Sequence, residues 1–365
     1  MRGSRRQVFG PSGRPVGRLC VGVLGIVGLL AVPSLVPVGG PAASATPTPP
    51  TVEAWIYPGG TGEATCDVPA ELSALAADPV AMLKPQYLTV GGNGKVTIDT
   101  AADLPCNGFS PANLAAVRSA ARSVDVTVSA GTHATRALLG SRARRSAALA
   151  TVESFVASNG LDGVDLDFEP GNWTASMWSG YLEFVGSLAG ALAPGGRGVE
   201  VDLEPFTMTP WDAERYHDVA AAGAHLVVMA YDHEYDGACA AISPYGWLQQ
   251  VVNYAQSQVP AADLTIGLPS YGYRTTSCTK VRHVTSNVPY TTMRNEPGFP
   301  TTPAAVEARR DPGSGEIRWT SGGVFFDYVD ATALDAKLQA VEALGVTDVS
   351  VWSLGGEPWF TGNPG

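Results

Sequence analysis

Eight short runs of β-branched and apolar residues alternate along this chain with longer stretches rich in Ala and Leu. This alternation restricts the fold most, because strands joined by helical crossovers form parallel sheets, and eight such strands close into a barrel. The chain is therefore predicted to be an α/β protein with the (β/α)8 TIM barrel architecture. We expect strands at 52–57, 86–90, 124–130, 163–168, 198–203, 225–230, 264–268 and 348–353, and helices at 69–77, 111–122, 142–159, 178–192, 212–222, 244–257 and 333–344.

One connection in this order is too long to be a simple loop. About 60 residues separate the strand ending at 268 from the helix beginning at 333, and they are rich in Thr, Pro, Gly and Arg. An unstructured loop of that length is rare inside a compact domain. We therefore expect a small β-rich insertion at about 274–330, with strands at 316–320 and 323–328.

The N-terminal segment has the composition of an export signal. Five arginines come before an uncharged apolar run, and small residues ending in Ala43-Ser44-Ala45 follow it. A basic region, an apolar region and an A-x-A site predict a cleaved signal peptide at 1–45. A Thr/Pro-rich linker at 46–51 and a single catalytic domain at 52–365 follow, and we expect a secreted protein.

A membrane anchor is the alternative interpretation of this segment, since its apolar run is almost long enough to span a bilayer. Pro33 and Pro37 interrupt the run and no basic flank follows it, so we favour cleavage. The pair Arg5-Arg6 resembles a twin-arginine signal only loosely, and the export route stays open. After cleavage we expect a monomer without stable membrane association.

The charge balance restricts the partners of the chain. The net charge is −11 at pH 7. Loss of a signal peptide that carries five arginines and no acidic residue would bring the net charge to about −16. An acidic surface disfavours nucleic acid and anionic lipid, and it suits a neutral substrate better than a polyanionic one.

Four cysteines remain once Cys20 is assigned to the signal peptide. Export permits disulfides, and four cysteines allow three pairings. The loops after neighbouring predicted strands carry these cysteines, so we expect two bridges near the carboxyl ends of the strands. The expected bridges are Cys66–Cys106 and Cys239–Cys278. A zinc site is the alternative, but the wide spacing and the absence of C-x-x-C argue against it.

The run at 161–170, LDGVDLDFEP, carries the strongest chemical signal. Asp165, Asp167 and Glu169 alternate with apolar residues, so on a strand the three carboxylates share one face over roughly 13 Å. Inside a barrel that face points inward, and carboxylates crowded there cannot all ionise, so at least one pKa should rise. A carboxylic acid that stays protonated near neutral pH is what a glycosidase needs to protonate a leaving oxygen.

Two other interpretations of the carboxylate strand compete with catalysis. An Asp-rich run can bind calcium, but calcium loops need turns and Gly where this segment has strand-forming residues. A purely structural strand is also conceivable, although three unpaired carboxylates are an unfavourable way to build a core. We therefore favour the catalytic interpretation.

The same segment resembles the D-G-x-D-x-D-x-E signature of glycoside hydrolase family 18, the chitinase family, with every position filled. The run MAYD at 229–232 is similar to the family's M-x-Y-D, and GLPSYG at 267–272 is similar to its G-x-P-x-Y-G. Trp352 stands where the family has the tryptophan that floors the −1 sugar subsite. The run SAGT at 129–132 matches the family's S-x-G-G only in part. Together these motifs extend over essentially the whole predicted catalytic domain.

The resemblance implies catalytic roles by position. Glu169 would be the general acid and then the general base. Asp167 would hold the acetamido group of the substrate, and Asp165 would share a proton or a hydrogen bond with Asp167. Tyr231 would hold the acetamido oxygen, which would act as the nucleophile of a retaining, substrate-assisted reaction. The resemblance implies no metal and no organic cofactor.

Substrate contacts are implied in the same way. Asp232 would contact the −1 sugar beside the acetamido group. Trp352 would stack beneath the ring, since the C–H face of a sugar packs on aromatic carbon. Further substrate contacts are implied at Met229, Tyr271 and Tyr57.

Within the family, Tyr271-Gly272-Tyr273, the insertion and LGGEP at 354–358 resemble one branch. That branch contains N-acetylglucosaminidases that lyse peptidoglycan and spore cortex, and their chitinase-like relatives. The predicted activity is endo-hydrolysis of β-1,4 linkages next to N-acetylglucosamine, in chitin or in peptidoglycan glycan strands. A non-catalytic lectin on the same barrel and an endo-N-acetylglucosaminidase acting on N-glycans are the alternatives. The presence of Glu169 argues against the lectin, and the MAYD run argues against N-glycans.

A second acidic strand has no assignment from the resemblance. Its carboxylates are Glu200, Asp202 and Glu204. We expect this polar face to be partly solvated or paired with arginine.

Overall fold

The structure is a computed structural model that describes residues 50–57, 75, 80–104, 108–233, 239–276, 286–288, 290–355 and 358–361. The predicted signal peptide and nearly all of the linker lie outside these ranges, as does the predicted helix at 69–77 apart from Leu75. Within the described part of the chain, no helix has the length and apolar character needed to cross a membrane.

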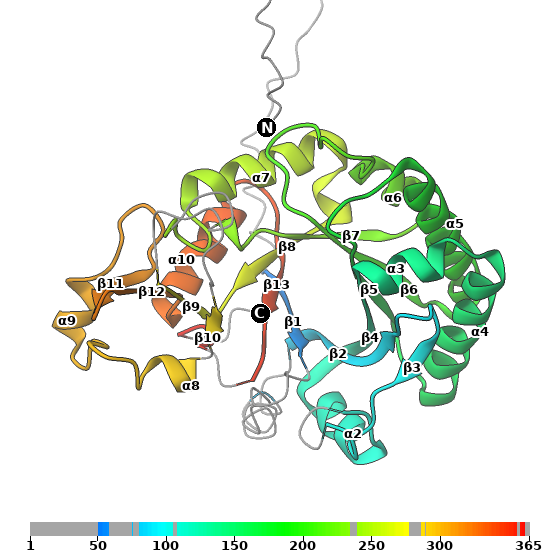
Figure 1. The fold of residues 1–365 in the computed structure, drawn as a ribbon, viewed down its shortest axis with the longest axis horizontal. Coiled ribbons are helices and arrows are strands. Elements are labelled where there is room, and N and C mark those ends of the chain that lie inside the picture. The colour runs from blue at the N-terminus through cyan, green and yellow to red at the C-terminus, as the bar shows by residue number, and fades with distance from the viewer. Residues whose placement is uncertain are drawn as a thin grey trace, which may run out of the picture. The chain divides into compact units, whose positions relative to one another are not determined.

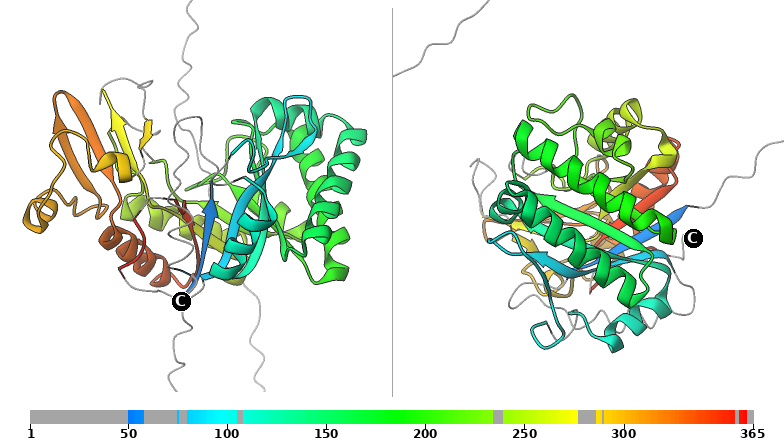
Figure 2. Two further views of the ribbon diagram at one scale, coloured as in Figure 1. Left: turned by 90° about the horizontal axis from the view of Figure 1, so that it is seen from below. Right: turned by 90° about the vertical axis from the view of Figure 1, so that its right-hand side faces the viewer.

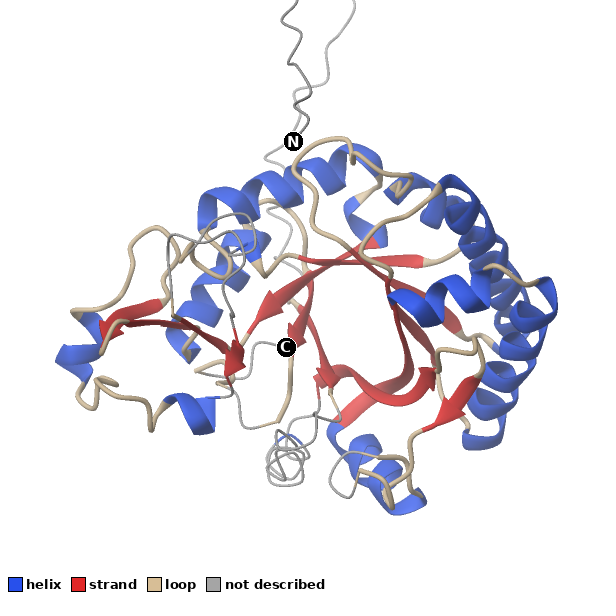
Figure 3. Cartoon of the chain, viewed as in Figure 1, coloured by secondary structure: helices blue, strands red, loops and turns tan. Residues whose placement is uncertain are grey.

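Eight parallel strands close into a barrel, which confirms the predicted (β/α)8 fold (Figures 1 and 3). Their order around the barrel is β1-β13-β8-β7-β6-β5-β4-β2, and pairing of β1 with β2 closes the ring. A short strand, β3 (Val96–Ile98), adds antiparallel to β2. The barrel strands are β1 (Thr51–Ile56), β2 (Val80–Val90), β4 (Ala121–Gly131), β5 (Gly163–Glu169), β6 (Gly198–Leu203), β7 (His225–Met229), β8 (Leu264–Pro269) and β13 (Asp348–Trp352).

Helices cover the outside of the barrel, as Figures 1 and 2 show, and α5 packs against α4 and β6. Their ends carry ordinary capping signals: the Ser141 hydroxyl accepts a bond from Arg144 N at the start of α4, and Gly160, with φ 58°, ends that helix. The helices of the barrel are α2 (Pro111–Ala120), α3 (Thr132–Leu139), α4 (Arg142–Asn159), α5 (Ala175–Leu192), α6 (Tyr216–Ala221), α7 (Tyr245–Gln258) and α10 (Ala331–Glu342).

The predicted elements differ from the structure by a few residues at many boundaries, and more strongly at β2, α3 and α6. Strand β2 begins at Val80, and the prediction started it at residue 86. The stretch with Lys84 and Pro85 was not expected to be strand, because neither residue is typical of a central strand. Helix α3 follows β4 directly and was not predicted. Helix α6 is only six residues long, since residues 212–215 belong to the preceding connection.

The predicted insertion is present as a four-stranded antiparallel sheet in the order β10-β9-β12-β11. It has a small core of its own, in which Trp319 stacks on Phe326 with ring centroids 4.9 Å apart. Its elements are β9 (Gly272–Thr275), β10 (Ser286–Val288), α8 (Tyr290–Met293), α9 (Pro303–Glu307), β11 (Ile317–Ser321) and β12 (Val324–Tyr328).

A buried ion pair ties the insertion to the barrel. Lys337 of α10 donates to the Glu316 carboxylate at 2.9 Å, and both side chains are fully buried. The same carboxylate accepts backbone N–H bonds from Ile242 and Ser243, which precede α7. One carboxylate therefore joins the insertion, the last helix and the connection after β7.

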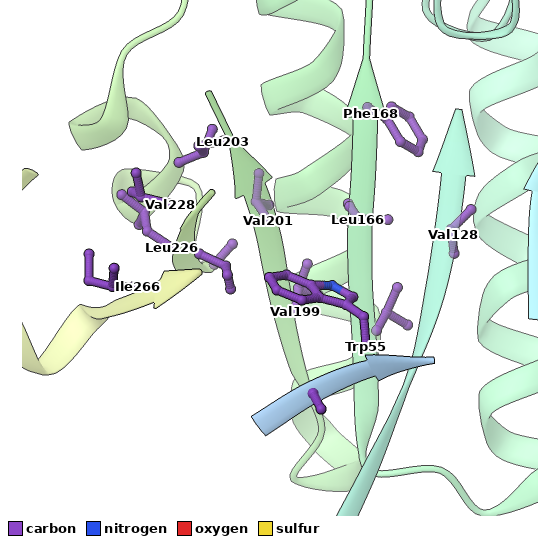
Figure 4. Packing of buried hydrophobic residues seen from close by; sticks show 14 of the residues in the cluster. Trp55, Val128, Leu166, Phe168, Val199, Val201, Leu203, Leu226, Val228 and Ile266 are labelled. Atoms are coloured by element: carbon purple, nitrogen blue, oxygen red, sulfur yellow. The ribbon is translucent and has the colours of Figure 1, made fainter. Parts of the chain in front are cut away.

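The outward face of the strands is apolar and packs against the helices. Leu166 and Phe168 of β5 lie beside Val201 and Leu203 of β6, as Figure 4 shows. Since side chains alternate along a strand, the residues between them point into the barrel, and on β5 and β6 those residues are acidic. The fold thus places carboxylates from neighbouring strands inside one enclosed space.

Candidate active site

The three carboxylates of β5 lie at increasing distance from the interior of the barrel, and the last of them is at the carboxyl-terminal edge. Asp165 is fully buried, Asp167 is 7% exposed, and Glu169, the last residue of the strand, opens into a cleft. In barrels of this type the loops at the carboxyl ends of the strands build the active site. The depth of each carboxylate therefore separates a supporting group, Asp165, from groups that a substrate can reach.

Asp165 is held from two other strands of the barrel, the adjacent β4 and the more distant β1. Trp55 of β1 donates its indole N–H to one carboxylate oxygen at 3.0 Å, and the Thr127 hydroxyl of β4 donates to the same oxygen at 2.7 Å. Thr127 is the direct parallel partner of Asp165 in the sheet. Burial raises the pKa of Asp165, although the charge of Lys84 opposes the rise. These contacts orient Asp165 towards the base of the site.

Asp167 is buried with one oxygen left over. Ser129 of β4 lies opposite it in the sheet and its hydroxyl hydrogen-bonds the carboxylate. The other oxygen, Oδ1, has no hydrogen-bond partner within the described part of the chain. Burial, followed by the charges of Glu169 and Asp165, raises the pKa of Asp167 well above its usual range. Asp167 can therefore either carry a proton or accept a hydrogen bond from a substrate through Oδ1.

Glu169 reaches solvent through the cleft, but the cleft walls remove much of the water around its carboxyl. This desolvation raises the pKa of Glu169. Because Asp167 lies two residues away on the same face, the two groups share protons instead of ionising independently. A carboxylic acid that keeps its proton at the open edge of the site has the form a general acid requires.

Below these groups lies a buried cation. Lys84 Nζ is 2.6 Å from Glu200, 2.9 Å from Glu53 and 3.8 Å from Asp165, and its side chain is fully buried. Burial alone would lower the pKa of Lys84, but the surrounding carboxylates raise it well above its usual range. Burial and the charge of Glu200 raise the pKa of Glu53 to about 8 in spite of Lys84. In this network Lys84 stays positively charged, and the raised pKa of Glu53 favours its protonated form.

This network corrects the expectation for the second acidic strand. Glu200 and Asp202 are 6% and 5% exposed, so they are buried and not partly solvated. The partner of Glu200 is a lysine and not an arginine. Only Glu204, at the end of this strand, reaches a solvent-filled space.

A cavity of about 550 Å³ opens beside Glu169. Tyr231 and Asp232, which follow β7, form one wall, and Trp247 of α7 extends it. The connection after β6, including Trp211, forms the rest of the lining. A cavity of this size accommodates one or two sugar rings.

The remaining predicted contacts gather near the same edge. The Tyr271 hydroxyl donates to the Asp232 carboxylate, and Asp232 has a left-handed backbone with φ 63°. Trp352, at the end of β13, packs on Tyr57 with ring centroids 5.4 Å apart and on Trp55 at 5.6 Å. Because Trp55 also holds Asp165, the aromatic group is connected directly to the carboxylate strand. The Trp352–Ser353 peptide bond is cis.

The family model for glycosyl hydrolases family 18 matches residues 62–357. The chain belongs to glycosyl hydrolases family 18. It is therefore a glycoside hydrolase, as the carboxylate strand predicts, and its family indicates a glycan substrate.

A curated relative is the "Cortical fragment-lytic enzyme" of Bacillus subtilis, 27% identical over 180 residues. The match covers 43% of this chain and 39% of the relative, so the chain spans less than half the length of the curated relatives it matches.

Solved structures share the fold at low identity. The spore cortex-lytic enzyme SleL of Bacillus megaterium QM B1551 superposes with a TM-score of 0.66 at 17% identity, covering 85% of this chain and 72% of that one. A chitinase from Chromobacterium violaceum gives a TM-score of 0.65 at 19% identity, covering 84% and 95%.

The structure brings the predicted site residues of this family 18 chain to one end of the barrel. Met229 and Tyr231 line the cavity together with Glu169. Cys239 is disulfide-bonded. Its expected partner Cys278 lies outside the described residues, as do Cys66 and Cys106, so both pairings stay predictions. In the described part of the chain, no group of three or more His, Cys, Asp or Glu side chains is arranged to hold a metal ion.

The residues that support the carboxylate strand from other strands were not predicted. Thr127 and Trp55 bind Asp165, and Lys84 neutralises the interior. The sequence does carry a signal for Lys84, since a lone lysine stands between Leu83 and Pro85 in a segment that is otherwise apolar enough to be a strand. A buried lysine requires carboxylate partners, and the acidic strands supply them.

Proposed function

We propose that this chain is a secreted retaining glycosidase that hydrolyses β-1,4 linkages next to N-acetylglucosamine, in chitin or in peptidoglycan glycan strands. The relatives support both polymers, because one is named for spore cortex fragments and others are named as chitinases. The export-type composition of residues 1–45 supports secretion.

The buried Oδ1 of Asp167, which has no hydrogen-bond partner within the described part of the chain, is the observation that carries the proposal. A retaining glycosidase of the usual kind has a second carboxylate about 5–5.5 Å from the acid, positioned to attack the sugar. Asp167 lies at roughly 6.6 Å along the strand from Glu169, and it is buried below the cleft. Its unpartnered Oδ1 is therefore better placed to accept a hydrogen bond from an amide N–H than to attack the sugar as a nucleophile.

The nucleophile is then the carbonyl oxygen of the substrate's own 2-acetamido group. As Glu169 gives its proton to the leaving glycosidic oxygen, the C1–O bond breaks and the acetamido oxygen bonds to C1, forming an oxazolinium ion. Asp167 accepts the acetamido N–H and stabilises the developing positive charge. The reacting oxygen is already attached to the sugar, so the attack is intramolecular and loses little entropy.

Water completes the reaction on the same face. The Glu169 carboxylate takes a proton from this water while the oxygen of the water attacks C1. The attack breaks the bond between C1 and the acetamido oxygen, which opens the five-membered ring and restores the acetamido group. Two displacements at C1 retain the anomeric configuration. Tyr231 holds the acetamido oxygen in line, Trp352 supports the sugar ring, and no step needs a metal or an organic cofactor.

An oligosaccharide whose −1 sugar is glucosamine should bind and fail to turn over, because it has no acetamido oxygen to attack C1. Hydrolysis of matched oligomers that differ only in this N-acetyl group, followed by chromatography, measures the effect. A thiazoline analogue of the oxazolinium should inhibit competitively. Efficient cleavage with glucosamine at −1 would instead make Asp167 or another carboxylate the nucleophile.

Substitution of Asp167 by Asn should lower kcat strongly and move the basic limb of the kcat/KM profile to lower pH. Glu169 must be protonated to act, and its pKa is raised. The neighbouring Asp167 helps to keep a proton on the pair, so without that carboxylate Glu169 loses its proton at lower pH. The exposed Glu153→Gln variant should leave the profile unchanged. A basic limb that stays in place in Asp167→Asn would show that the two groups titrate independently.

A further inference from the structure

The cavity beside Glu169 extends on both sides of the scissile bond, if the proposed function holds. Met229, Tyr231 and Asp232, the expected contacts of the −1 sugar, line it together with Glu169, which protonates the oxygen between the two sugars. The rest of its described lining comes mainly from the connection after β6 and from Trp247. We therefore place the sugar that departs, at subsite +1, against the connection after β6.

Trp211 forms an aromatic platform on the connection after β6. Trp211 is 75% exposed and Met208 71% exposed. The start of this connection is held by two bonds: Phe206 N–H donates to the Tyr216 hydroxyl at 3.1 Å, and Glu204 N–H donates to the buried Glu214 carboxylate at 3.2 Å. An exposed indole on an anchored connection is suited to stack on a sugar ring.

The same cavity has more acidic than basic side chains in its described lining, where His233 is the one basic residue. The half-buried Glu204 lines it, and its carboxylate has no hydrogen-bond or ion-pair partner within the described part of the chain. Asp232 and Glu169 also line the cavity, and no Lys or Arg is found among the described lining residues. Burial, with the charges of Asp212 and Glu169, raises the pKa of Glu204. A cation in the cavity would relieve this unfavourable concentration of carboxylates.

We propose that Glu204 is a specificity residue that makes subsite +1 prefer a glucosamine unit, as in partly N-deacetylated chitin, and disfavour an acidic sugar. The inference rests on the proposed function and deepens it, since it selects chitin over peptidoglycan, in which N-acetylmuramic acid would occupy subsite +1. The ammonium group at C2 of glucosamine would pair with Glu204 while the ring stacks on Trp211. N-acetylglucosamine is neutral and binds without this pairing. The lactyl carboxylate of N-acetylmuramic acid meets like charge at the half-buried Glu204.

Three tetrasaccharides test this inference directly. All have N-acetylglucosamine at the first, second and fourth positions, and the third unit is glucosamine, N-acetylglucosamine or N-acetylmuramic acid with a free lactyl carboxylate. The kcat/KM for cleavage after the second unit, measured at pH 6, should decrease in that order. Each step should be roughly threefold to tenfold, the usual effect of one partly exposed charge pair.

The isosteric Glu204→Gln variant should compress these three values towards one another, with glucosamine losing and N-acetylmuramic acid gaining. The Trp211→Ala variant should lower all three values alike, because stacking does not depend on the charge of the sugar. Glu153→Gln removes an equal charge from the outer surface of α4 and should leave the order unchanged.

Ratios that stay the same in Glu204→Gln, in protein with an unchanged melting temperature, would overturn the role of Glu204. That result differs from failure of the proposed function. If the fully acetylated tetrasaccharide is not cleaved by the unaltered protein, the glycosidase proposal itself fails, whatever the three ratios are.

Discussion

Replacement of Glu169 by Gln should reduce kcat by roughly 10²- to 10⁴-fold while the affinity for oligosaccharide survives. Gln keeps the volume of the side chain and its place at the end of β5, but it has no proton to give to the leaving oxygen. The pKa of Glu169 is raised by desolvation, which favours the protonated form that a general acid requires. The reaction therefore depends on this one group for both of its proton transfers.

Hydrolysis of chitin oligomers and calorimetric titration with the same oligomers separate the two effects. The Glu153→Gln variant is the matched control, because it makes the same chemical change on the exposed side of α4. Retention of a tenth of the native activity by Glu169→Gln would refute the assignment of the acid. Loss of binding along with activity would assign Glu169 a role in holding the substrate instead.

The second large effect is expected on stability. Substitution of Lys84 by Met should lower the free energy of unfolding by about 3–5 kcal/mol at neutral pH, since removing one partner leaves buried carboxylates without compensation. Lys84 is fully buried between Glu53 and Glu200, and its shortest contact is 2.6 Å. Urea denaturation followed by circular dichroism measures the loss.

The pH dependence of this loss identifies its cause. In the folded protein burial already raises the pKa of Glu53 to about 8, and without Lys84 it must rise further. A carboxyl with a raised folded pKa destabilises the protein when it is ionised, so the deficit of Lys84→Met should shrink as the pH falls. Lys95→Met, at an exposed lysine, should change stability by less than about 0.5 kcal/mol.

Combining Lys84→Met with Glu53→Gln and Glu200→Gln should recover a large part of the lost stability, because the unpaired charges are then absent. Equal destabilisation by the single and the triple variants would mean that Lys84 matters through packing on Trp55, whose ring centroid is 4.6 Å from its Nζ.

Most of the fold was predictable because its signal is local. The strand at 198–203 has the predicted boundaries, because its apolar residues mark it in the sequence. The helix at 142–159 also has them, because a serine cap precedes it and a glycine ends it. The first half of β2 was missed because Lys84 and Pro85 oppose a strand locally, and only the pairing with neighbouring strands overrides them.

The site divides in the same way. Alternation along β5 is sufficient to place Asp165, Asp167 and Glu169 on one face. The partners of Asp165 could not be predicted, because Trp55 and Thr127 meet it only through strand register and closure of the barrel. Glu204 and the aromatic platform were missed for a further reason: their position depends on how an irregular connection is anchored, and a single sequence contains little information on that.

The contact between Glu316 and Lys337 has a consequence for exchanging parts between relatives. Because this carboxylate belongs to the insertion while its cation belongs to the last barrel helix, the insertion is not an independent cassette. A chimera that replaces the insertion and omits Glu316 would leave Lys337 buried without a counter-charge, next to two backbone N–H groups that have lost their acceptor. Grafts of the insertion must therefore carry both residues together, or replace both with an apolar pair.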